Sequence, residues 1–211
     1  MATTEAKVDH RRRLLDGLAQ SLRENGLQGT QITDIVAHAR TSRRTFYECF
    51  PDKESAFVEL IRELRNSVID AIEAAIDPDA DWEDQIDRAI DVYLGAISED
   101  PALSATVSRD LPTLGDRGAA LQHEGVDRFA SLVMELANDS GMRRDGVPRI
   151  SRETAVMLMG GVAELINRAR SGGADLASAA STSKSVIKIV MRPQGRDGAD
   201  SGVREGRRGR A

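Results

Sequence analysis

The segment from residue 40 to residue 53 concentrates side chains that can bind nucleic acid. Arg40, Arg43 and Arg44 lie within residues 35–47, a stretch that contains no acidic residue. A guanidinium group can donate two hydrogen bonds to a guanine edge, and threonine can contact a thymine methyl group. Hydroxyl groups and lysine suit phosphate oxygens. A local cationic patch is what a DNA-contacting element requires, because neutralising phosphates supplies much of the affinity.

The local sequence pattern places these side chains on a short helix. Ser42 can cap a helix over residues 43–49. Another short helix, over about residues 30–39, precedes it, so the pair and its tight connection have the size of a helix-turn-helix. Four of the seven aromatic residues fall within residues 46–57, and a few large rings can fill the core of so small a unit. The alternative is that the arginines only form a solvated helix face.

The rest of the chain also predicts helices, so we expect an all-α fold. Apolar residues recur at the spacing of a helix face, and no segment shows convincing strand alternation or an internal repeat. Thr30, Ser42, Asp52, Asp81 and Asp100 are expected to cap helices. The expected helices cover approximately residues 8–24, 30–39, 43–49, 52–76, 81–97, 101–112, 126–141, 151–171 and 175–191.

Length and composition suit one large folded domain or two small ones. The chain has 211 residues, of which 40% are hydrophobic and 30% charged, enough apolar material to bury a core. The longest nearly unbroken apolar run, Ala155 to Ile166, is too short to cross a bilayer. Because the N-terminus is polar up to Arg13, we expect a cytoplasmic protein with no membrane segment. The single cysteine excludes an intramolecular disulfide and a CxxC zinc site.

The charge is distributed unevenly along the chain. The net charge is −5, but residues 1–66 carry +1, residues 67–191 carry −9 and residues 192–211 carry +3. The acidic residues therefore lie in the middle, and both ends are mildly basic. Glycine and arginine dominate the last segment without apolar periodicity, which predicts a disordered basic tail.

Three motifs occur in order near the N-terminus. They are Gly-Leu-Gln-Gly-Thr-Gln-Ile-Thr-Asp-Ile-Val over residues 26–36, Ser-Arg-Arg-Thr-Phe-Tyr-Glu-Cys-Phe over residues 42–50, and Pro-Asp-Lys-Glu over residues 51–54. Together they resemble the N-terminal domain of TetR-family transcriptional regulators, with residues 42–50 as the recognition helix. The resemblance covers about a quarter of the chain. It implies an all-helical dimer with a DNA-reading head and a body that binds a small effector.

The resemblance also implies roles for single residues of the head. Thr33 and the recognition helix would face bases or phosphates, and Tyr47 and Lys53 would hold the DNA backbone. The expected DNA-binding residues are Thr33, Arg40, Ser42, Arg43, Arg44, Thr45, Tyr47 and Lys53.

Two residues of the turn depart from the family pattern. Arg40 stands where the family usually has glycine, and Thr41 stands where it usually has valine. A residue with a side chain adopts the left-handed conformation at a cost of about 1 kcal/mol or more. We therefore expect the turn to be either strained or differently shaped. Arg40 also adds a cation beside the presumed DNA face, and the hypothesis is that it contacts a phosphate.

The body is expected to contain an effector pocket and a dimer interface. The helix over 151–171 is apolar on almost every side, so it must pack both on its own domain and on something else. The expected two-fold interface comprises Gly160, Gly161, Leu165, Leu176, Val186 and Val190. Aromatic rings and adaptable methionines can line a largely apolar pocket, with Arg109 as a polar anchor. The candidates are Trp82, Tyr93, Arg109, Phe129, Met134 and Met157, and ordinary core packing is the alternative for most of them.

These expectations combine into one functional hypothesis. Residues 1–51 would form a helix-turn-helix DNA-binding domain, residues 52–191 an effector-binding and dimerisation domain, and residues 192–211 the tail. The protein would be a homodimeric repressor on a palindromic double-stranded operator, released when a small, largely apolar effector moves the helix over 52–76. The alternatives are a DNA binder without a ligand and a helical protein that only dimerises. The sequence shows no catalytic constellation, cofactor motif or metal-ligand spacing, so we expect neither an enzyme nor a cofactor.

Overall fold

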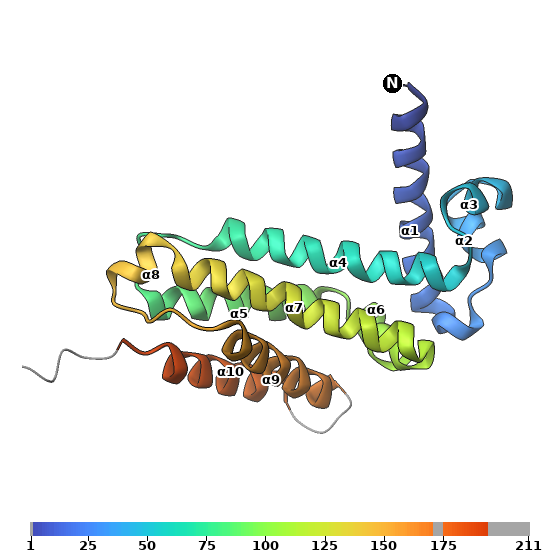
Figure 1. The fold of residues 1–211 in the computed structure, drawn as a ribbon. Helices are drawn as coiled ribbons and strands as arrows, with labels where there is room; N and C mark the ends of the chain where they lie inside the picture. The colour runs from blue at the N-terminus through green and yellow to red at the C-terminus, as the bar shows by residue number, and fades with distance from the viewer. Residues whose placement is uncertain (1, 171–174, 194–211) are drawn as a thin grey trace, which may run out of the picture.

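The computed structural model describes residues 2–170 and 175–193, and every regular element in these ranges is a helix (Figure 1). The expected all-α class is confirmed. The tail expected over 192–211 lies, from residue 194 onward, outside the described residues. The elements are α1 (Ala2–Gly29), α2 (Ile32–His38), α3 (Arg43–Cys49), α4 (Lys53–Ala75), α5 (Trp82–Glu99), α6 (Pro101–Asp110), the short 3-10 helix η1 (Leu111–Leu114), α7 (Asp116–Asn138), α8 (Ser140–Arg144), α9 (Arg152–Arg170) and α10 (Leu176–Met191).

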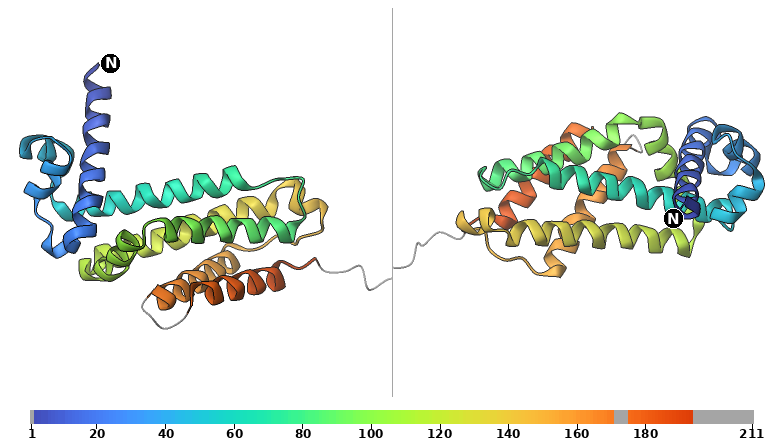
Figure 2. Two further views of the ribbon diagram at one scale, coloured as in Figure 1. Left: turned by 180° about the vertical axis from the view of Figure 1, so that it is seen from behind. Right: turned by 90° about the horizontal axis from the view of Figure 1, so that it is seen from above.

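The helices form a small head and a long body. Helices α1 to α3 make the head, and α1 stands across the end of the body (Figure 1). Helix α4 leads from the head along α7, and the α9–α10 pair lies on the side of the body away from α4 (Figure 2). None of the helices within residues 2–170 and 175–193 is both long enough and apolar enough to cross a membrane.

The head is held together by one hydrophobic cluster. Leu18 of α1, Ile35 of α2 and Phe46 of α3 are fully buried in it. Leu103 of α6 and Leu121 of α7 belong to the same cluster. The head and the adjoining end of the body therefore share a continuous core, which positions α3 relative to the body.

Most of the expected helix caps are present. The Ser42 hydroxyl accepts a hydrogen bond from the Thr45 amide at 3.1 Å, which begins α3. The carboxylates of Asp52 and Asp100 cap α4 and α6 in the same way. Such bonds satisfy amide groups that have no partner within the helix.

Two expected caps are wrong. The hydroxyl of the buried Thr30 donates to the Gly26 carbonyl at 2.6 Å instead of capping α2. Gln31 takes the cap position, and its amide donates to the Asp34 carboxylate at 2.9 Å. Asp81 precedes α5, but its side chain makes no capping bond. The carboxylate of a distant residue, Asp145, accepts from the first amide of α5 at 3.1 Å.

Helix ends also differ from expectation: α1 begins at Ala2 rather than near residue 8, α7 begins at Asp116 rather than near residue 126, and further differences lie at Gly26 and after Asn138. Gly26, expected to stop the first helix, bends it at a φ of 68° and a further turn follows up to Gly29. Glycine tolerates this left-handed conformation without steric cost. The short helix α8, capped by Asp139, occupies a stretch where the sequence indicated only a helix end and a polar loop.

Candidate functional site

Helix α3 presents a cationic and polar outer face. Phe46 is completely buried and anchors the helix, whereas Arg43 and Arg44 are exposed and Tyr47 is 52% exposed. The Arg44 Nε atom lies 2.9 Å from the Glu48 carboxylate, one turn further along the helix. Arg43 makes no hydrogen bond or ion pair with any residue that the structure describes. Both guanidinium groups are thus accessible, and one of them already has a neighbouring carboxylate.

The remaining expected contact residues lie around the start of α3. The hydroxyls of Ser42 and Thr45 are 2.9 Å apart and hydrogen-bonded to each other. Thr33 is exposed near the start of α2. The Lys53 ammonium group donates to the carbonyls of Leu27 and Thr30 at 2.7 and 2.8 Å. Lys53 therefore fixes the connection between α1 and α2 against α4, with one of its three protons left for another acceptor.

The turn between α2 and α3 contains the left-handed residue that the sequence raised as a possibility. Arg40 has a φ of 48°, the one positive φ outside glycine among the described residues. The Thr41 amide donates to the Val36 carbonyl at 2.9 Å, and the Arg40 amide donates to the Ala37 carbonyl at 3.2 Å. These two bonds form a Schellman motif, which usually has glycine at the left-handed position. Of the two expected possibilities, the turn is strained rather than differently shaped.

Arg13 of α1 holds this turn in place. Its Nη2 atom donates to the carbonyls of Ala39 and Arg40 at 2.7 and 2.9 Å. Arg11, two residues earlier, lies over the Phe50 ring at 4.8 Å. No local signal indicates the clamp, because its partners lie 26 and 27 residues away.

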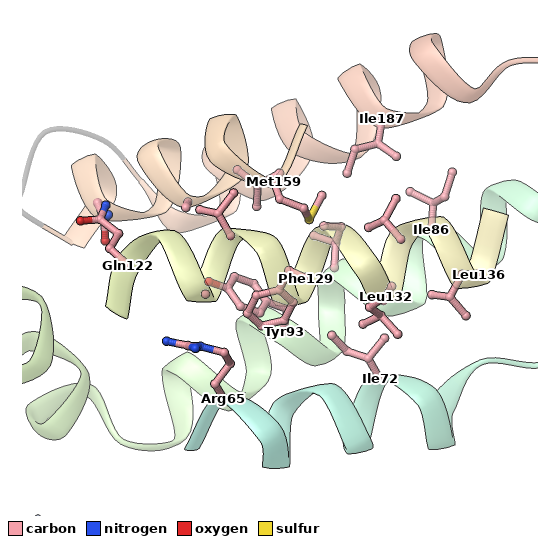
Figure 3. A pocket seen from close by; sticks show the side chains of 18 of the residues that line it. Arg65, Ile72, Ile86, Tyr93, Gln122, Phe129, Leu132, Leu136, Met159 and Ile187 are labelled. Carbon is pink, nitrogen blue, oxygen red and sulfur yellow. The ribbon is translucent and has the colours of Figure 1, made fainter. Parts of the chain in front are cut away.

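The body contains a cavity of about 440 Å³ that is lined by residues of every helix from α4 to α10, the short helix η1 included. Its middle is lined by Tyr93 and Phe129, whose rings meet edge to face at 5.3 Å (Figure 3). Ile86, Leu136 and Ile187 lie toward one end, and Arg65 and Gln122 lie toward the other (Figure 3). The cavity is therefore apolar at one end and polar at the other. Its size falls in the range of small-molecule sites.

Two arginines and no carboxylate line this cavity among the described residues. Arg65 donates to the Leu121 carbonyl at 3.0 Å and pairs with Glu124 at 3.2 Å. The Nη2 atom of Arg170 is buried and has no hydrogen-bond partner. Burial lowers the pKa of both guanidinium groups, a shift that Glu124 opposes for Arg65 and Tyr93 opposes for Arg170. Neither Arg65 nor Arg170 was predicted from the sequence as a cavity residue, because basic residues are common in the last turn of a helix and at the edges of amphipathic helices.

Only two of the six expected pocket residues, Tyr93 and Phe129, line this cavity. Met157 is 65% exposed on the outer side of α9. Arg109 points away toward the bend at Gly26 and pairs with Asp110. Trp82 packs at the start of α5 against a neighbouring cluster, and Met134 lies on a different face of α7 from the lining residues next to it. Helix rotation within the packed body decides these orientations.

The residues expected at a dimer interface divide into two groups. Gly160 and Gly161 of α9 face open space, and Val186 of α10 is 45% exposed. Leu176 and Val190 pack against the protein's own core instead, and Leu165 is half-buried. Met157 and Ile189, the latter 73% exposed, add further apolar surface to the same two helices.

Comparison with known proteins identifies the head. Residues 14–60, from the middle of α1 into α4, match the family described as "Bacterial regulatory proteins, tetR family". The head of the chain, over residues 14–60, therefore belongs to the TetR family. The matched segment contains the whole of α2, α3 and the strained turn.

Similar proteins extend the likeness to the body. The chain is 25% identical over 132 residues to the HTH-type transcriptional regulator EthR of Mycolicibacterium smegmatis, and this match covers 61% of the chain and 60% of EthR. A putative TetR-family regulator from Mesorhizobium loti has a similar structure, with a TM-score of 0.67 and 18% identity over 87% of this chain and 96% of that one. FadR from Bacillus subtilis, solved in complex with stearoyl-CoA, also has a TM-score of 0.67, with 16% identity over 87% and 99% of the two chains. At these identities the solved structures show a shared fold.

Proposed function

We propose that this chain is a homodimeric transcriptional repressor that binds a palindromic DNA operator and releases it when a small molecule enters the body cavity. The observation that carries the proposal is the outer face of α3, where Arg43 and Arg44 are exposed above a buried Phe46. The match of residues 14–60 to the TetR family supports it. In this proposal, residues 1–51 read DNA and residues 52–191 bind the effector and dimerise.

The contacts with DNA would divide between bases and phosphates. Arg43 and Arg44 would donate to guanine edges in the major groove. Hydroxyl groups of Thr33, Ser42, Thr45 and Tyr47 would bond phosphates or, for Thr45, contact a thymine methyl group. Arg40 would neutralise a phosphate beside the turn. Lys53 would give its remaining proton to the DNA backbone while it holds the α1–α2 connection.

Dimerisation would use the exposed face of α9 and α10. Gly160 and Gly161 leave room for a close helix, and Met157, Val186 and Ile189 provide apolar surface around them. A two-fold axis through this face would join two helix pairs into a four-helix bundle. The two α3 helices must then lie about 34–36 Å apart to enter successive major grooves.

The effector would act through the helices that join cavity and head. Ile72 of α4 and Val107 of α6 line the cavity, while α4 and α6 both pack against α1. The sequence pointed to α4 as the route, and the structure adds α6. FadR, with the same fold, is solved with stearoyl-CoA bound. An effector would shift the equilibrium between the two arrangements of the heads. The size of that shift would be set by the difference in its affinity for the two arrangements.

Selection from random DNA duplexes at two salt concentrations tests the proposal. The full-length protein should enrich a palindromic motif, and the enrichment should persist at the higher salt concentration, because base contacts depend less on salt than phosphate contacts do. Binding that vanishes with salt and enriches no motif would favour a helical protein that only dimerises.

A second measurement separates the repressor from a DNA binder without a ligand. Scattering from the free protein and from the protein with a selected effector should show a changed separation of the two heads. An unchanged separation and unchanged head mobility would rule out the proposed release mechanism. The cavity is the observation that favours a ligand over a body that serves dimerisation alone.

A further inference from the structure

We propose that the body cavity selects an anion with an apolar body, and that Arg170 binds its charged group. This inference rests on the proposed effector role of the cavity and names the chemical class of the effector. The sequence reasoning had expected only a largely apolar molecule. The assignment comes from the charges that line the cavity and from a buried guanidinium nitrogen there, Nη2 of Arg170, that has no hydrogen-bond partner among the described residues.

Arg170 lacks the compensation that a buried charge needs. It lies in the last turn of α9, and its Nη2 atom is buried without a hydrogen-bond partner. No carboxylate lines the cavity among the described residues, and no ion pair of Arg170 occurs there. A buried charge without a partner is costly, so such groups are normally paired. An anion inside the cavity would supply the missing partner.

The contrast with Arg65 strengthens this assignment. Arg65 also lines the cavity, but it pairs with Glu124 and donates to the Leu121 carbonyl. Its donors are therefore largely used by the protein itself. The charges of Arg65 and Arg170 both oppose the rise that burial causes in the pKa of Tyr93. Both guanidinium groups line the same cavity as this phenol, which can donate a further hydrogen bond to an anion.

The remainder of the cavity suits an apolar body. Ile72, Ile86, Leu136 and Ile187 lie away from Arg65 and Gln122 (Figure 3). Their side chains offer no hydrogen-bonding atom to a polar ligand. A carboxylate, sulfonate or phosphate monoester attached to an aliphatic or aromatic body would match both ends, because a guanidinium group can bind two oxygens of such an anion at once.

Three ligands that differ only in the charged end test the proposal. Isothermal titration calorimetry of the full-length protein would use decanoate, 1-decanol and decylamine as probes. We expect decanoate to bind at least about tenfold more tightly than either of the other two. Arg170→Gln should reduce this preference to less than about threefold, and Arg170→Lys should retain part of it. Arg152→Gln is the matched control, because Arg152 lies on the same helix but is exposed and pairs with Asp127.

Thermal unfolding guards against a variant that merely fails to fold. Arg170→Gln removes a buried, unpaired charge, so the ligand-free variant should unfold at the same or a higher temperature than the unsubstituted protein. Decanoate should raise the unfolding temperature of the unsubstituted protein by more than it raises that of Arg170→Gln.

Two results would overturn the proposal. One is a failure of decanoate to bind, and the other is binding of decanol or decylamine as tight as that of decanoate. A preference that survives Arg170→Gln unchanged would reject Arg170 as the binding group. These outcomes are independent of operator selection, so the anion preference can fail while the DNA-binding function stands, and the reverse also holds.

Discussion

The Asp110 carboxylate accepts a hydrogen bond from the Leu27 amide at 2.7 Å, although the two residues are 83 positions apart. Leu27 follows the bend in α1, and Asp110 ends α6. Arg109 pairs with the same carboxylate at 2.9 Å. Because Val107 and Leu111 beside it line the cavity, this buried bond links the head directly to the cavity wall.

Removing the Asp110 carboxylate should destabilise the protein. Asp110→Ala leaves the buried Leu27 amide without an acceptor, and we expect a loss of about 1–3 kcal/mol in the free energy of unfolding. Urea denaturation measures the loss. Asp127→Ala is the control, since Asp127 belongs to an exposed ion pair and its removal should cost less than about 1 kcal/mol. Equal losses for the two variants would contradict the role of Asp110.

The contribution of Asp110 to the free energy of unfolding should depend on pH. Burial raises its pKa, but hydrogen bonds from Arg109 and Leu27 outweigh this, so its pKa lies below the ordinary 3.8. A carboxyl whose pKa is lower in the folded state stabilises the protein at pH values above its ordinary pKa. This stabilisation is lost as the pH falls through the folded-state pKa. The stability difference between the unsubstituted protein and Asp110→Ala should stay constant from about pH 7 to pH 5 and shrink toward pH 3. Urea denaturation at these three pH values checks it, and a constant difference at all three would refute it.

Arg40 should carry a cost in stability and a gain in DNA affinity. Arg40→Gly relieves the left-handed strain and should stabilise the protein by roughly 1 kcal/mol. The same change should weaken DNA binding and reduce the dependence of log affinity on log salt by about one unit. Arg40→Ala separates the two effects, because it removes the charge but keeps the strain. If Arg40→Gly leaves affinity and salt dependence unchanged, the phosphate contact is wrong.

Arg43 and Arg44 should determine operator sequence. Arg43→Ala and Arg44→Ala should each lower affinity by about 1–3 kcal/mol and relax the preference at one base pair of each half-site. Competition binding with substituted operators measures both effects. Arg88→Ala is a control for net charge, because Arg88 is exposed on α5 in the body. A uniform loss of affinity over all operators would instead indicate phosphate contacts.

A charge on the exposed face of α10 should separate the protomers. Ile189→Glu would place a carboxylate in the proposed apolar interface, and we expect the dimer dissociation constant to rise at least about tenfold. Analytical ultracentrifugation measures it. Leu64→Glu, on the partly exposed face of α4, should leave the dimer intact. A dimer insensitive to Ile189→Glu would place the interface elsewhere.

The head was predictable because its signals are local. Capping by Ser42 depends on residues three positions apart, and burial of Phe46 follows from the periodicity of one short helix. The cap expected of Thr30 was wrong, because its side chain is buried in the packed head and its hydroxyl donates backward to the Gly26 carbonyl. The clamp from Arg13 was not predictable, because a flexible cation carries no sequence signal for carbonyls on another helix.

The sequence by itself determined most of the helices, the caps at Ser42, Asp52 and Asp100 and the cationic face of α3, and it left two possible shapes for the turn at Arg40. Each of these depends on backbone and side-chain preferences within a few residues. Only the tertiary structure decided which side chains line the cavity, that the Nη2 atom of Arg170 is buried without a hydrogen-bond partner among the described residues, and that the Asp110 carboxylate accepts from the Leu27 amide. The physical reason is that periodicity gives a helix an apolar face but not its rotation against several neighbours. That rotation, set by packing of the whole body, decides whether a charge at the edge of the face meets water, a carboxylate or a ligand.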